Sequence, residues 1–193
     1  VTLDMPRAGK NIDWTGTTNT PMWQEGGIAT EIYGSLTLVS GMNNNFTRWI
    51  NMRGRADGMP VGGWTLTTAG RNMAYFNTCM IGTGSTLKLL DALQSSNSVI
   101  FNCGTFNANN FNVTGVALGF YGGILTMGSG TWTVTGAGTV WYYSGSPTIN
   151  PDTSTIVVSN TTATAKTFDG AGKTYNNVTF SGDNITVTGA NTF

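Results

Sequence analysis

The side chains that could carry out catalysis in this chain are nine carboxylic acids and two cysteines, because the sequence contains no histidine. The lack of histidine excludes Ser-His-Asp and Cys-His catalysis and every His-ligated metal site. Carboxylates could still hydrolyse a glycosidic bond, which requires two of them about 5–9.5 Å apart. The acids are Asp4, Asp13, Glu25, Glu31, Asp57, Asp91, Asp152, Asp169 and Asp183. None forms a D-x-D or E-x-D motif, and aspartates in turns are usually structural, so we expect no catalytic site.

The segment GAGKT at residues 170–174 resembles part of a phosphate-binding loop. Such a loop needs the pattern G-x-x-x-x-G-K-[ST] between a strand and a helix. Here Thr167 stands at the first glycine position, and the following YNNVTFSG alternates like a strand. No helix N-terminus is then available to hold phosphate, so we predict a glycine turn with Lys173 in solvent, and neither a cofactor nor a metal.

Two segments are candidates for binding. In FTRWINMRGRAD (46–57), the densest charge of the chain surrounds a tryptophan. If Phe46, Ile50 and Met52 face inward, then Trp49, Asn51 and Arg53 face outward. Trp and Arg are enriched at binding hot spots, although an exposed edge with ordinary solubilising charge fits the segment equally well. In WYYSG (141–145), adjacent aromatic residues cannot share one face of a strand, so we expect an exposed tyrosine. The candidate interface or glycan contacts are Arg48, Trp49, Arg53, Arg55 and Tyr142.

The composition indicates many short strands joined by tight turns. The 193 residues include 33 Thr, which favours strands, and 27 Gly and 20 Asn, which tolerate the positive φ angles of turns. Only 9% of the residues are charged and the net charge is zero, so there is no electrostatic footprint for nucleic acid or anionic lipid. No apolar run approaches 18 residues, so we expect no membrane insertion.

One short pattern recurs along the chain: an apolar residue, Thr or Asn, an apolar residue, and then Ser, Thr or Gly. The copies are LTLVSG (36–41), WTLTTAG (64–70), FNVTG (111–115), LTMGSG (125–130), WTVTG (132–136), VTFSG (178–182) and ITVTG (185–189). Alternation with period two predicts strands with one buried face. Val178 and Ile185 are 7 residues apart, one strand plus one turn, whereas Val113 and Val134 are 21 apart.

These spacings predict an all-β fold, namely a parallel β-solenoid (β-helix) of three faces. Each rung would contain about 21–24 residues, and the chain would form roughly nine rungs. An antiparallel sandwich also shows alternation with regular turns, but near-identical repeat units favour stacked rungs. We predict that residues 32–193 form the solenoid and that it continues beyond one or both ends in a longer chain. Residues 1–31 look irregular and would form an N-terminal cap or docking segment. In GSTLKLLDALQSSNS (84–98), we favour a strand pair over a one-turn helix acting as a lid.

Cys79 and Cys103 lie 24 residues apart, about one rung. Stacked positions would place their Cα atoms about 4.8 Å apart, which is within the range of a disulfide. Stacked free thiols are equally compatible with this spacing. We favour the thiols for a protein that is assembled in a cytosol.

Residues 153–193, TSTIVVSNTTATAKTFDGAGKTYNNVTFSGDNITVTGANTF, resemble β-helical repeat regions of tailed-phage structural proteins and related bacterial surface proteins. LDMPRAGKNIDWTGTTNTPMW (3–23) and IYGSLTLVSGM (32–42) are similar to the same group. The resemblance implies a virion or cell-surface fibre and carries over no catalytic motif.

We therefore expect a structural virion protein, not an enzyme: a tail fibre, spike or capsid decoration that is assembled in the host cytoplasm. Its expected partners are further copies of itself, with a trimer as one arrangement, other virion proteins, and a cell-surface glycan. Two alternatives stay open, namely a polysaccharide-binding or -cleaving surface module and a bacterial surface adhesin, which would be extracellular or at the cell surface.

Overall fold

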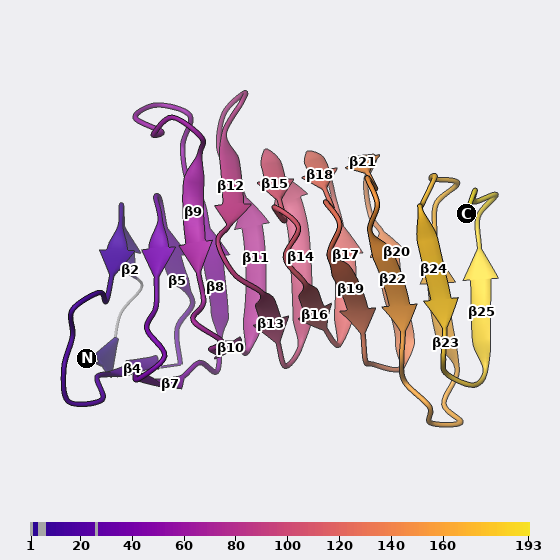
Figure 1. Ribbon diagram of the computed structural model, residues 1–193, viewed down its shortest axis with the longest axis horizontal. Helices are drawn as coiled ribbons and strands as arrows, with labels where there is room; N and C mark the ends of the chain where they lie inside the picture. The colour runs from indigo at the N-terminus through magenta and orange to yellow at the C-terminus, as the bar shows by residue number, and fades with distance from the viewer. Residues whose placement is uncertain (1, 4–6, 26) are drawn as a thin grey trace.

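The computed structural model describes residues 2–3, 7–25 and 27–193, and none of these residues is helical. Every strand pairs only with strands one rung before or after it, and all of these pairs are parallel. Figure 1 shows the resulting rod, with strands side by side along its long axis and the two ends of the chain at opposite ends. The prediction of a three-faced parallel β-solenoid is confirmed.

The first seven rungs contribute one strand to each of three faces, which we call A, B and C in chain order, and the strands after β21 belong to faces A and B only. Face A contains β1 (Thr2–Leu3), β4 (Met22–Glu25), β7 (Asn43–Asn45), β10 (Asn72–Met73), β13 (Leu93–Ser95), β16 (Val113–Gly115), β19 (Thr131–Val134), β22 (Thr155–Val158) and β24 (Asn177–Phe180). Face B contains β2 (Arg7–Gly9), β5 (Thr30–Ile32), β8 (Trp49–Met52), β11 (Tyr75–Cys79), β14 (Ser98–Cys103), β17 (Ala117–Phe120), β20 (Gly138–Tyr143), β23 (Lys166–Asp169) and β25 (Ile185–Thr188). Face C contains β3 (Ile12–Asp13), β6 (Leu36–Thr37), β9 (Trp64–Thr67), β12 (Thr86–Leu89), β15 (Thr105–Asn107), β18 (Ile124–Thr126) and β21 (Thr148–Asn150).

The length of a rung varies around the predicted value because the corners differ. Phe106 pairs with Leu125, 19 residues later, whereas Leu36 pairs with Leu66, 30 residues later. The longest rung includes the corner 53–63, which projects from the rod between β8 and β9 (Figure 1). Face B is a single ladder of nine strands, and face A is interrupted between β7 and β10.

Inward and outward side chains alternate along the strands as the sequence pattern predicts. In β19, Trp132 and Val134 are buried, and the threonines beside them are half-buried on the outer surface. In face B the inward residues form one column through seven rungs: Ile50, Phe76, Val99, Leu118, Trp141, Phe168 and Val187. Val187, on the last strand, is 42% exposed, whereas the other six are buried, and burial of each of these six contributes about 1.5–3 kcal/mol to holding the rungs together.

Residues 84–98 form β12, β13 and the beginning of β14, so the strand interpretation is confirmed and the helical lid is wrong. Residues 1–31 are irregular in having strands of two to four residues and a long connection over 14–21. The parallel ladders nevertheless begin within this segment, since β2 pairs with β5 and β3 with β6. Residues 1, 4–6 and 26 of the segment, Asp4 among them, lie outside the described residues.

Cys79 and Cys103 form a disulfide between β11 and β14, so our preference for free thiols is wrong. The preference rested on the expected compartment, whereas the register brings the two cysteines directly opposite each other. Thr78 lies opposite Phe101, but a bulge after Thr78 places Cys79 opposite Cys103 instead of Asn102. The two Cα atoms are then 4.3 Å apart.

Candidate functional site

The structure brings three of the five predicted contact residues onto face B and leaves two at its corners. Trp49 and Arg53 lie on the outer side at β8, and Tyr142 lies on the outer side of β20. Arg48 lies in the corner before β8, where its Nε donates a hydrogen bond to the carbonyl of Gly27 (2.9 Å). Arg55 is exposed in the corner after β8 and forms an isolated bridge with Ile81.

A shallow groove of about 340 Å³ runs along the outer side of face B. Its lining comes from β8, β11, β14 and the residue that follows β17. The lining residues, which we call the face B groove, are Trp49, Asn51, Asn77, Ile100, Asn102 and Tyr121. These strands are consecutive members of one ladder, and Tyr121 lies four residues further along its strand than the position level with Trp49, so the groove crosses face B diagonally.

Aromatic pairs stand at both ends of the face B groove. At the β8 end, the ring of Trp49 lies 4.9 Å from that of Tyr75, which is its ladder partner. At the other end, Tyr121 and Tyr142 pack edge to face with ring centroids 6.2 Å apart. Tyr121 is 41% exposed. Each end therefore presents a large flat surface, whereas the floor between them carries shorter side chains.

The floor of the groove contains a chain of amide hydrogen bonds that begins at an ion pair. Arg53 donates to one carboxylate oxygen of Glu31, and Asn51 Nδ2 donates to the other at 2.7 Å. Asn77 Nδ2 then donates to Asn51 Oδ1 at 3.1 Å. The next position of this column is Ile100, which has no donor, and Asn77 Oδ1 is buried without a hydrogen-bond partner.

Tyr142 leans across its ladder neighbour Gly119. A Cβ placed on Gly119 would lie 2.4 Å from the ring atom Cζ of Tyr142, so the ring covers the space that a side chain would occupy. Burial, followed by the nearby hydroxyl of Tyr121, raises the pKa of Tyr142 to about 12. Tyr142 is thus half-buried, more covered than the sequence suggested.

The groove and the aromatic pair at its β8 end include residues that sequence reasoning did not select, namely Tyr75, Asn77, Ile100, Asn102 and Tyr121. They come from three further rungs, and only the register places them beside Trp49. The usable signal was the outward position of each residue within its strand combined with the length of each rung.

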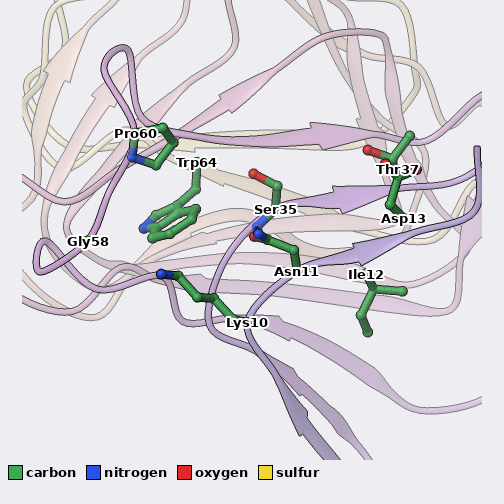
Figure 2. A pocket seen from close by; sticks show the side chains of 9 residues that line it. All are labelled: Lys10, Asn11, Ile12, Asp13, Ser35, Thr37, Gly58, Pro60 and Trp64. Atoms are coloured by element: carbon green, nitrogen blue, oxygen red, sulfur yellow. Dashed lines mark hydrogen bonds between the residues drawn. The ribbon is translucent and has the colours of Figure 1, made fainter.

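A second hollow, also of about 340 Å³, lies where the corner 53–63 approaches β3 and β6. Figure 2 shows Lys10 and Trp64 at one end and Asp13 with Thr37 at the other. The Lys10 ammonium is 5.6 Å from the centroid of the Trp64 ring. Hydrogen bonds from Thr15 lower the pKa of Asp13, whose Oδ1 accepts the Thr15 amide at 2.8 Å. Lys10 and Asp13 are both exposed, and we assign no ligand to this hollow.

Several carboxylates serve the turns. Asp91 accepts the backbone amides of Thr68 and Ala69, Asp152 accepts that of Gly128, and Asp169 accepts that of Ala171. Within the described residues, no three His, Cys, Asp or Glu side chains lie close enough together to hold a metal ion.

The GAGKT segment is a turn that follows β23. Thr174 forms a bridge with Thr192, and the next element is strand β24, as the sequence predicts. The described part of the chain contains no helix with the length and hydropathy needed to cross a membrane.

Three parallel ladders around an apolar interior define this chain as a β-solenoid that has an aromatic and amide groove on one face. In comparisons with known proteins, no family model, no curated protein and no solved structure matches it.

Proposed function

We propose that this chain is a rigid structural element of a virus particle, as part of a tail fibre, spike or capsid decoration. The observation that carries the proposal is the unbroken face B ladder of nine parallel strands. Its eight steps of about 4.8 Å give a shaft of roughly 38 Å. Backbone hydrogen bonds and buried columns connect every rung to the next, so stiffness requires no cofactor. The resemblance of residues 153–193 to phage β-helical regions supports the virion as the location.

Side-by-side association is part of this proposal. With only 9% charged residues and no net charge, the surfaces of two rods repel each other weakly. We expect light scattering to give a multiple of the chain mass of 20.4 kDa, with three times this value for a trimer. Small-angle scattering should show an elongated particle. A mass equal to one chain at micromolar concentration would contradict the association.

The location is tested separately. Antibodies raised against the chain should label virus particles purified from the source, and cross-linking of these particles should attach the chain to other virion proteins. Labelling of bacterial surfaces in cultures without particles would instead favour an adhesin that uses the same rod.

A further inference from the structure

We infer that the face B groove binds a neutral, extended oligosaccharide that crosses successive rungs diagonally. This inference adds a binding site to the structural role proposed above and does not depend on that role, because a single chain contains the whole groove.

The aromatic pairs at the two ends suit the apolar faces of sugar rings. A pyranose presents C–H groups on one side of its ring, and their contact with an aromatic face removes apolar surface from water. The Trp49 ring packs against Tyr75, with ring centroids 4.9 Å apart. The Tyr121 ring packs against Tyr142, with ring centroids 6.2 Å apart. These pairs hold the rings in place before a ligand arrives, which lowers the entropic cost of binding.

The amides of the floor suit hydroxyl groups. An Asn side chain both donates and accepts, as each sugar hydroxyl does. Because Asn51 donates to Glu31, its oxygen faces Asn77, and the Asn77 amide is oriented in turn. Asn77 Oδ1 is left as an acceptor without a donor, and Asn102 is exposed beside it. Asn77 Oδ1 is closed to solvent, so the exposed amide of Asn102 is the floor group that can exchange hydrogen bonds with a ligand hydroxyl.

The electrostatics of the groove favour a neutral ligand. All six lining residues are uncharged. Of the charged side chains nearest to them in the chain and the ladder, Arg53 and Glu31 form an ion pair, and Arg48 donates its Nε to the carbonyl of Gly27. A carboxylate or sulfate would lose hydration in the groove without gaining an opposite charge.

The length of the groove sets the size of the ligand. Trp49 on β8 and Tyr121 after β17 are three ladder steps apart. Tyr121 also lies four residues further along its strand than Ala117, the position level with Trp49. Three steps of about 4.8 Å across the strands and four residues of about 3.3 Å along them amount to roughly 20 Å, the length of about four pyranose units in an extended chain.

The test uses the full chain and neutral oligosaccharides of glucose, galactose and N-acetylglucosamine, from one to six units long, together with uronate and sulfated oligosaccharides of equal length. Binding is followed by calorimetry and by tryptophan fluorescence. We expect saturable binding of at least one neutral series, at least tenfold tighter for four units than for one, with little gain beyond five.

Variants locate the binding site. Trp49→Ala and Tyr121→Ala should each weaken binding at least tenfold, whereas Tyr121→Phe, which keeps the ring, should bind like the parent chain. Ile124→Ala is the matched control, because Ile124 is an exposed apolar residue on face C. Circular dichroism verifies the folding of each variant, and Tyr121→Phe keeps the test decisive if an alanine variant does not fold.

Four results would overturn the inference: no saturable binding of any neutral series, preference for uronate or sulfated chains, equal binding by the alanine variants, or a light-scattering mass that falls in Trp49→Ala. The last result would make the groove a contact between copies of the chain. Glycan binding by a single-chain species would leave this inference standing even if the structural role fails.

Discussion

Gly119→Ala is a direct test of how closely the outer side chains of face B pack. The nearest atoms to a Cβ at this position all belong to the Tyr142 side chain, and the closest is 2.4 Å away. Carbon atoms in contact are about 3.5–4.0 Å apart, so the tyrosine ring must move by more than 1 Å. Because the ring is half-buried on the outer surface, it can swing outward and leave the backbone in place.

This movement should change the titration of Tyr142. Burial is the main cause that raises its pKa to about 12, so displacement of the ring should lower the pKa towards the ordinary value of 10. The assay is the absorbance of tyrosinate near 295 nm as a function of pH, with Tyr142→Phe used to assign the step. Gly41→Ala is the control, because a Cβ at Gly41 would meet no atom within 4 Å.

Stability gives an independent measure of the same contact. Alanine is favoured over glycine within a strand by roughly 0.5–1 kcal/mol, whereas overpacking costs about 1–3 kcal/mol. Gly119→Ala should therefore destabilise the parent chain and stabilise the Tyr142→Ala variant, as measured by denaturant unfolding. Equal effects in both backgrounds, with the Tyr142 step still near pH 12, would refute this account of the packing.

Three further perturbations follow from the interior and the corners. Replacement of both Cys79 and Cys103 by serine should lower the free energy of unfolding by about 3 kcal/mol through the lost constraint on the unfolded chain; an unchanged value, measured by denaturant unfolding, would exclude a stabilising disulfide. Burial raises the pKa values of Tyr143 and Tyr175, so the folded chain keeps protons that the unfolded chain loses above about pH 10. The free energy of unfolding should therefore fall above this pH, and Tyr143→Phe should make the fall shallower in urea titrations at high pH. Lys166 is fully buried and its ammonium donates to two backbone carbonyls, so Lys166→Met should cost about 1–3 kcal/mol, and an equal melting temperature would contradict that role.

The sequence predicted the class of fold because alternation and repeat length are local properties. It did not predict the register. The spacing of Val113 and Val134 suggested that these residues stack, but Val113 pairs with Trp132 and Val134 pairs with Gly115. A slip of two residues leaves every side chain on the same face, so alternation cannot detect it. The corners decide the register, and their lengths differ from rung to rung.

The candidate site likewise has one part that alternation predicts and one part that only the register decides. That Trp49 and Arg53 face outward followed from alternation alone. The groove did not, because it needs the exact neighbours of Trp49 on three further strands. The spacing of Cys79 and Cys103 predicted that they stack, but the choice between a disulfide and free thiols did not follow from the sequence, because their exact opposition depends on the bulge after Thr78.

The raised and hollow parts of a solenoid face come from the sizes of its outward side chains, because the strands beneath form a nearly regular surface. On face B, large rings stand at Trp49 and Tyr121, and shorter amides lie between them at Asn51 and Asn77. The ladder fixes the spacing of these side chains to the spacing of the rungs. The rigidity that suits this chain to a structural role is therefore also what would keep a binding groove in shape without a ligand.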